Sequence, residues 1–589
     1  SYGKKGDAVV QMNWKAIDAG VDAVHKVNVP ESWHNPAPDA APKALKGPDA
    51  LVKQIRDVME PISRMDGDSL PVSAFEGNVN GEWEQGASAY EKRGTAVMVP
   101  EWDAEKCIQC NQCAFVCSHA TIRPFCLTAD EAANAPESTK LADTKPKAGE
   151  YKFTMAVSPL DCMGCGECVT VCPTKAIEMK PQESQAAQQA AFDYCVENIR
   201  KKDNIPGVVS DISVKGSQFN QPLLEFSGSC AGCAETSYAR LITQLFGEKM
   251  FISNATGCSS IWGGTASISP YTTNKESGFG PAWINSLFED NAEHGLGMQI
   301  GYETVRANLI TKVEALKGKN ADLDAVIDKY LETKNNTKAN DAPAKALIAA
   351  LEACGCDESK EILKDKQYLA KKSFWIFGGD GWAYDIGYGG LDHVLASGHD
   401  VNVMVFDTEM YSNTGGQASK ASNIGEVCQF AAAGKEISKK SLAEICMTYG
   451  YIYVAQIALG ANMAQAVKAI AEAEAYPGPS IIIGYAPCEL HGVKGGMTNC
   501  QNEMKKAVAA GYWNLFSFNP AAKAEGKNPF TLTSKAGDMS KYQEFLANET
   551  RYSRLARAFP DRAKELFEKN QEVADARYTH LTKLVDLYK

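Results

Sequence analysis

Two runs of closely spaced cysteines carry the clearest chemistry in this sequence. The pattern C-x2-C-x2-C-x3-C occurs over residues 107–117 and again over residues 162–172. In runs of this spacing, the first three thiolates bind one [4Fe–4S] cluster and the fourth thiolate binds the other cluster. The predicted ligands of the first cluster are Cys107, Cys110, Cys113 and Cys172. The predicted ligands of the second cluster are Cys162, Cys165, Cys168 and Cys117.

Zinc is the alternative metal, because it also binds four cysteines. Zinc motifs usually use paired C-x2-C knuckles rather than three cysteines at x2-x2 spacing. Pro173 follows Cys172 as expected for a cluster run, whereas Ser118 follows Cys117. This departure weakens the turn signature and leaves the ligand set intact. Since iron–sulfur centres move one electron at a time, two clusters in one small domain predict an electron relay.

Four further cysteines could complete a third site with thiolate ligands: Cys230, Cys233, Cys258 and Cys488. Spacing alone leaves a redox dithiol or ordinary buried cysteines open as alternatives. The remaining seven cysteines have no ligand spacing and are interpreted as ordinary thiols: Cys126, Cys195, Cys354, Cys356, Cys428, Cys446 and Cys500.

A second motif points to a bound diphosphate. Asp380, flanked by Gly379 and Gly381, closes an apolar run, and Thr408 follows 28 residues later, just past another apolar run. A diphosphate needs a hard divalent cation with oxygen ligands, and the glycines let the backbone approach the phosphates. This is the shape of the thiamine-diphosphate motif. A simple turn at residues 379–381 and an exposed loop at residues 411–417 are the alternatives.

These residues need a parallel sheet to bring them together. Apolar runs at residues 250–253, 373–377, 401–406 and 480–485 predict strands, and helical patterns at residues 442–449 and 463–474 lie between them. Strands of this kind, separated by helices, are typical of a parallel sheet buried on both faces. Ligands bind at the carboxyl ends of such strands. The predicted fold class is therefore α/β, with a small α+β two-cluster domain.

The 589 residues imply several domains. We expect the tail of an upstream domain at 1–45, a connecting domain at 46–100, the cluster domain at 101–200, the α/β domain at 201–540 with a helical insertion at about 303–372, and a helical arm at 541–589. The net charge of −12 argues against nucleic acid. No apolar stretch suits a membrane span, and no apolar signal core follows Ser1, so we expect a cytoplasmic protein.

These features occur together in one family. Over nearly its whole length, the chain resembles the C-terminal half of pyruvate:ferredoxin oxidoreductase. Besides the two cysteine runs, the resemblance rests on residues 229–236, 255–259, 270–274, 285–293, 379–387 and 407–417.

The resemblance implies roles for particular residues. Cys230, Cys233, Cys258 and Cys488 would hold a third [4Fe–4S] cluster next to the cofactor. Asp380 and Thr408 would bind Mg²⁺ by side chain and Met410 by its carbonyl. Further expected contacts to thiamine diphosphate are Glu235, Cys258, Gly379, Gly381, Trp382, Thr408, Glu409, Met410, Tyr411, Ser412 and Asn413. Asn413 and Cys258 are the expected catalytic residues, with Asn413 facing the substrate.

The implied reaction is the reversible oxidation of pyruvate with coenzyme A to acetyl-CoA and CO₂, with ferredoxin or flavodoxin as electron acceptor. The family's N-terminal half carries the Glu that activates thiamine and part of the substrate pocket, so we expect this chain to need that half, in a homodimeric enzyme. Another 2-oxoacid substrate, an electron-carrying polyferredoxin without catalysis and a zinc-stabilised scaffold are the alternatives.

Overall fold

The computed structural model describes residues 3, 6–34, 44–147, 150–265, 267–318 and 320–589. Residues 35–43, within the predicted tail, lie outside the described residues. Two compact units are present, Ser1–Val52 and Lys53–Lys589. The first unit contains helix α1 (Asp7–Asp22), which buries none of its side chains. Among the described helices, none is long and apolar enough to cross a membrane.

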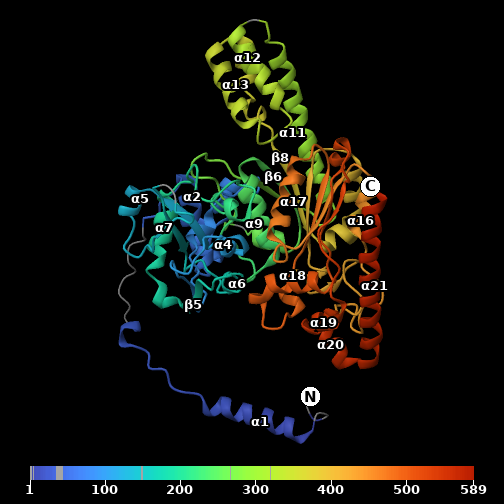
Figure 1. The fold of residues 1–589 in the computed structure, drawn as a ribbon. Helices are drawn as coiled ribbons and strands as arrows, with labels where there is room; N and C mark the ends of the chain where they lie inside the picture. Colours follow the sequence, from blue (N-terminus) through green and yellow to red (C-terminus); the bar gives the residue numbers. More distant parts are fainter. Residues whose placement is uncertain (1–2, 4–5, 35–43, 148–149, 266, 319) are drawn as a thin grey trace. The chain divides into compact units, whose positions relative to one another are not determined.

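An eight-stranded sheet forms the centre of the second unit (Figure 1). Its strands, in spatial order, are β15 (Phe530–Leu532), β14 (Phe516–Phe518), β12 (Tyr453–Ile457), β13 (Ser480–Tyr485), β9 (Asn402–Asp407), β8 (Ser373–Gly379), β6 (Met250–Ala255) and β7 (Ala282–Ser286). The six strands from β12 to β7 are parallel, and β14 and β15 complete one edge as antiparallel strands. This confirms the predicted α/β class.

Burial explains why the apolar runs become strands here. Every residue of β9 and β13 is buried, as is all of β8 except Gly379. Strands buried on both faces need helices on each face. The helices that share the sheet's apolar core include α9 (Ala234–Phe246), α11 (Asn291–Glu314), α15 (Tyr388–Ala396), α16 (Leu442–Met447), α17 (Met463–Ala475) and α18 (Cys500–Ala509).

The cluster domain is built from two small antiparallel sheets. Strand β1 (Met98–Trp102) pairs with β5 (Ile177–Pro181). Strand β4 (Lys152–Val157) pairs with both β2 (Ile122–Leu127) and β3 (Ala142–Asp143). Two short helices, α4 (Gln112–Val116) and α6 (Glu167–Thr170), begin within the two cysteine runs and pack against each other. Helix α7 (Gln188–Asn198) then covers β4.

The charged region after residue 303 is helical. Helix α11 runs on from the sheet into this region and joins α12 (Ala321–Thr333), α13 (Asp341–Cys354) and α14 (Asp357–Leu363). These helices enclose their own apolar core, which includes Val313, Ile327 and Leu347. At the end of the chain come α19 (Tyr542–Ala547), α20 (Thr550–Ala558) and α21 (Pro560–Leu587).

Candidate cofactor and cluster sites

Four neighbouring strands end at the same edge of the large sheet. Register pairs Gly379 of β8 with Phe406 of β9, and Tyr485 of β13 with Asp407. The chain therefore brings together the residues that follow these strands, as it should at the carboxyl ends of parallel strands. These residues are Cys258 after β6, Asp380 after β8, Thr408 after β9 and Cys488 after β13.

Three oxygen atoms converge at this edge. The Thr408 Oγ1 atom lies 2.9 Å from Asp380 Oδ1 and 3.0 Å from the Met410 carbonyl oxygen. Neighbouring ligands of an octahedral Mg²⁺, each about 2.1 Å from the ion, are separated by about 3 Å. The spacing of the three oxygens therefore fits the predicted magnesium site.

The charge balance around Asp380 also fits a cation. Asp380 is fully buried, and Ser419 Oγ donates a hydrogen bond to its Oδ2 at 2.6 Å. Burial, and after it the neighbouring Asp407, raise the pKa of Asp380 well above its usual value. The Lys439 ammonium is already paired with Asp407 at 2.8 Å and with Glu409 at 3.0 Å. A divalent cation would provide the charge that stabilises an ionised Asp380.

Gly381 packs closely against the ring of Tyr411 beside this group. A Cβ atom at Gly381 would lie 2.6 Å from the Tyr411 ring, so only glycine fits. Trp382 is buried, and Ser412 Oγ donates a hydrogen bond to Thr408 Oγ1 at 2.8 Å. Asn413 is exposed in the loop between β10 (Met410–Tyr411) and β11 (Gln417–Ala418).

Glu409 differs from the other predicted contacts. Its carboxylate is fully buried and is bound by Lys439 and Arg551. The side chain is therefore already engaged within the protein, and the backbone is the part of Glu409 that can face a cofactor.

The third group of cysteines gathers beside this site. Burial raises the pKa of the Cys258 thiol, and Glu235 and the three other thiols raise it further. Cys233 precedes helix α9, and Cys258 begins helix α10 (Cys258–Gly263). In the first turn of α9, burial raises the pKa of Glu235 to about 7, and Trp262 Nε1 donates a hydrogen bond to this carboxyl at 3.4 Å.

His491 joins the two parts of the site. The Cys488 backbone N–H donates to His491 Nδ1 at 3.3 Å, so the ring proton is on Nε2, which donates to the Thr408 carbonyl at 2.7 Å. Burial, and then Arg551, lower the pKa of His491 to about 3, so the ring is neutral. Sequence reasoning missed this residue. Its position three residues after Cys488 was the available signal.

The two cysteine runs are crossed in space. Cys107, Cys110, Cys113 and Cys172 line one small cavity together. In the other group, burial raises the pKa of Cys162 to about 11, and Cys117 from the first run raises it further. No three His, Cys, Asp or Glu side chains among the described residues surround a single metal position. A four-iron cluster needs no such arrangement, because each thiolate binds a different iron atom.

The three cysteine groups follow one another. A Cβ atom at Gly232, between Cys230 and Cys233, would lie 3.4 Å from Cys165 Cβ, so the third group adjoins the second. Burial raises the pKa of Cys168 in the second group, and Cys113 of the first group is one of the thiols that raise it further.

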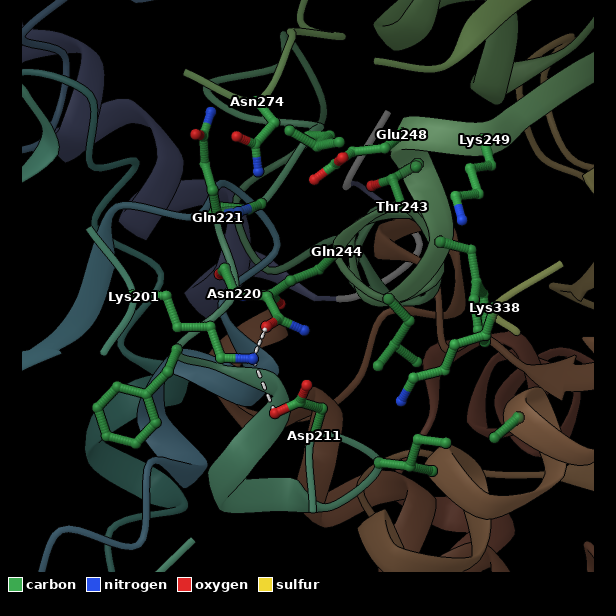
Figure 2. Close-up of a pocket in the computed structure, with 18 of the residues that line it drawn as sticks. Lys201, Asp211, Asn220, Gln221, Thr243, Gln244, Glu248, Lys249, Asn274 and Lys338 are labelled. Carbon is green, nitrogen blue, oxygen red and sulfur yellow. Dashed lines mark hydrogen bonds and ion pairs between the residues drawn. The ribbon is translucent and has the colours of Figure 1, made fainter. Parts of the chain in front are cut away.

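A cavity of about 680 Å³ lies elsewhere, near the start of β6 and the end of α9 (Figure 2). None of the predicted site residues is among the described residues that line it. Several of its polar side chains are already bound within the protein. Lys201 contacts Asp211 at 2.8 Å and Asn220 at 2.9 Å, and Lys249 contacts the Thr337 carbonyl at 3.0 Å.

Comparison with known families matches three parts of the chain. Residues 106–176 match a 4Fe-4S dicluster domain, and residues 363–483 match the C-terminal TPP-binding domain of thiamine pyrophosphate enzymes. Residues 39–96 match a domain of unknown function named EKR. The chain thus carries an iron–sulfur domain and a thiamine-pyrophosphate-binding domain.

Two relatives match nearly the whole of this chain. Pyruvate-flavodoxin oxidoreductase of Klebsiella pneumoniae is 48% identical over 99% of this chain and 49% of its own length. Pyruvate:ferredoxin oxidoreductase of Moorella thermoacetica is 48% identical over 100% of this chain and 50% of its own length. The chain is a homologue of the pyruvate-flavodoxin and pyruvate:ferredoxin oxidoreductases. The resemblance predicted from the motifs is confirmed.

The same comparison shows how much of each relative this chain covers. This chain spans about half the length of these two relatives. Mitochondrial pyruvate dehydrogenase [NADP(+)] of Euglena gracilis is 44% identical over 99% of this chain, which covers 32% of that protein. The number of clusters, the magnesium ion and the individual site residues stay predictions.

Proposed function

We propose that this chain is the C-terminal half of a thiamine-diphosphate-dependent enzyme. The enzyme reversibly converts pyruvate and coenzyme A to acetyl-CoA and CO₂ and reduces ferredoxin or flavodoxin. The observation that carries the proposal is the hydrogen-bonded link through His491. It joins Thr408, a predicted magnesium ligand, to Cys488, a predicted cluster ligand.

The residues assigned to the cofactor have separate tasks. Asp380 and Thr408 bind Mg²⁺ through their side chains, and Met410 binds it through its carbonyl. Residues 379–382 and 408–413 cradle the diphosphate, Glu235 and Cys258 add contacts, and the exposed Asn413 faces the substrate. When bound, thiamine diphosphate supplies the electron sink that decarboxylation requires.

The cysteines provide the route by which electrons leave. Cys230, Cys233, Cys258 and Cys488 hold a third [4Fe–4S] cluster beside the cofactor. The second group, which contains Cys165, adjoins it, and the first group, which contains Cys113, follows. This order supports stepwise transfer of single electrons from the cofactor to a soluble acceptor.

We further propose that an N-terminal half supplies what this chain lacks. The relatives are about twice as long as this chain. The missing half would provide the Glu that activates thiamine and part of the pocket for pyruvate and coenzyme A. The complete enzyme would be a homodimer.

The first experiment counts the clusters. Protein purified without oxygen should contain about twelve iron atoms and about twelve sulfides per chain if three four-iron clusters are bound. A value near eight would leave only the clusters of the two cysteine runs and would contradict the third site.

The second experiment tests the reaction with both halves present. Pyruvate, coenzyme A, thiamine diphosphate and Mg²⁺ should give acetyl-CoA together with reduced ferredoxin or flavodoxin. Faster turnover of 2-oxoglutarate or a branched-chain 2-oxoacid would overturn the choice of substrate. Failure to bind thiamine diphosphate, with clusters that still accept electrons, would favour a simple electron carrier.

A further inference from the structure

The turn that carries the predicted magnesium ligands has an unusual backbone conformation. Glu409 lies between Thr408 and Met410 and has a φ of +61°. This left-handed region is uncommon for residues other than glycine, and it persists where surrounding contacts fix the conformation. The contacts that fix Glu409 therefore also fix the two neighbouring ligand atoms.

Four side chains from other segments hold the buried Glu409 carboxylate. Tyr512 Oη donates to it at 2.5 Å, and Asn423 Nδ2 donates at 2.8 Å. The Lys439 ammonium lies at 3.0 Å and the Arg551 guanidinium at 2.8 Å. Two cationic side chains and two neutral donors therefore hold the carboxylate on several sides.

Arg551 comes from the end of the chain, far in sequence from the turn. It lies on α20 and is buried, with its Nε atom 2.6 Å from Glu549 and its Nη1 atom 3.2 Å from Glu426. Its guanidinium also lies 5.1 Å from the centre of the Tyr552 ring. These contacts fix the guanidinium in place, so it can act as a rigid support for Glu409.

We propose that Arg551 is a positioning residue for the magnesium site. Acting through Glu409, it holds the turn at residues 408–410 so that Thr408 Oγ1 and the Met410 carbonyl point to the cation beside Asp380. The inference rests on the proposed function. Without this support, Glu409 relaxes to negative φ and the Met410 carbonyl turns away from Thr408. The helical arm at residues 541–589 thereby becomes part of the cofactor site.

The test compares two carboxylates that bind the same guanidinium. Glu409→Gln removes the carboxylate in the turn, and Glu549→Gln removes one outside it. Both are made in the complete enzyme with the N-terminal half present. Affinity is measured as loss of the free Mn²⁺ signal in electron paramagnetic resonance and by calorimetry with thiamine diphosphate. We expect at least tenfold weaker binding for Glu409→Gln and less than twofold change for Glu549→Gln.

Arg551 itself is tested by a conservative rescue. Arg551→Lys keeps the positive charge and should bind Mn²⁺ at least threefold more tightly than Arg551→Met. Iron content and melting temperature are measured for every variant, because a purely structural role would change these and leave the affinity of the folded protein unchanged. If a variant lacks iron, Tyr512→Phe takes its place. It removes no charge, and it removes the hydroxyl that donates to Glu409 and accepts from Asn423 and Arg551. For Tyr512→Phe we expect at least threefold weaker Mn²⁺ binding.

The outcomes separate this inference from the proposed function. Wild-type protein that binds neither Mn²⁺ nor thiamine diphosphate would contradict the proposed function itself. Normal wild-type binding with unchanged affinity in Glu409→Gln, or in Tyr512→Phe where it is the substitute, would overturn the positioning role alone. Equal losses in Glu409→Gln and Glu549→Gln would also overturn it, because the effect would then be a general loss of packing.

Discussion

Asp380 is a buried carboxylate whose surroundings favour its neutral form unless a cation is bound beside it. Burial and Asp407 raise its pKa, while Ser419 and Thr408 donate hydrogen bonds to it. Asp380→Asn keeps the size of the side chain and removes the charge. We expect at least a hundredfold loss of affinity for thiamine diphosphate with Mg²⁺, measured by calorimetry, and an unchanged or higher melting temperature without cofactor.

Ser419→Ala is the control for Asp380→Asn. It removes one hydrogen bond to the same carboxylate and keeps the charge, so its affinity should fall less than that of Asp380→Asn. Cofactor binding by Asp380→Asn at wild-type strength would exclude Asp380 as a metal ligand.

Single residues were predictable from sequence where spacing carries the chemistry. The 28-residue separation of Asp380 and Thr408 matched two strand ends, and the structure brings these two side chains into contact. His491 and Arg551 were not predicted, because their roles depend on contacts that only folding creates. A lone histidine or arginine in a sequence gives no indication of which carbonyl or carboxylate it will meet.

At the scale of secondary-structure elements, Glu474 near the end of α17 connects this helix to two strands by hydrogen bonds. Trp375 of β8 and Asn402 of β9 each donate to its carboxyl at 3.3 Å. Burial raises the pKa of Glu474 to about 7. The unfolded chain ionises this group near pH 4.5, so its contribution to stability is complete below that pH and is lost as pH rises toward 7. The loss is about 3 kcal/mol.

The prediction for Glu474 is a change in the pH dependence of unfolding. Between pH 5 and pH 8, the melting temperature of Glu474→Gln should fall less than that of the wild type, because Gln has no proton to lose. Scanning fluorimetry across this range measures the difference. Glu525→Gln, which changes an exposed carboxylate, should follow the wild type. Parallel curves for Glu474→Gln and wild type would show that Glu474 keeps an ordinary pKa.

The crossing of the two cysteine runs predicts which cluster is lost when Cys172 is replaced. Cys172 follows α6 yet lines the cavity of the first run. Cys172→Ala should therefore remove about four iron atoms, and the lost cluster should be the one held by Cys107, Cys110 and Cys113. Iron analysis and paramagnetic resonance of the reduced protein measure this. Cys195→Ala, a change at a buried thiol outside all three groups, should keep the full iron content.

The strands differed in how well the sequence revealed them. The apolar runs of β8, β9 and β13 predicted these central strands, because burial on both faces leaves few polar residues. Strand β7 at the sheet edge has exposed residues and carries no such run, and β14 and β15 have three residues each. The insertion boundary at residue 303 fell inside α11, because one continuous helix of 24 residues leaves the sheet and enters the insertion.

At the scale of the whole molecule, we expect the third cysteine group to carry electrons from the cofactor to the two clusters of the cysteine runs. Cys488 touches the cofactor edge through His491, and Gly232 places the same group against Cys165. Cys488→Ser should lower iron from about twelve to about eight atoms per chain. Dithionite should still reduce the two remaining clusters, because it reaches them from outside. In the proposed complete enzyme, with the N-terminal half present, acetyl-CoA formation from pyruvate should fall at least a hundredfold, because electrons can no longer leave the cofactor. Cys500→Ser changes a fully buried thiol near both groups and should keep twelve iron atoms and turnover. Full iron content in Cys488→Ser would exclude Cys488 as a ligand and move the connection elsewhere.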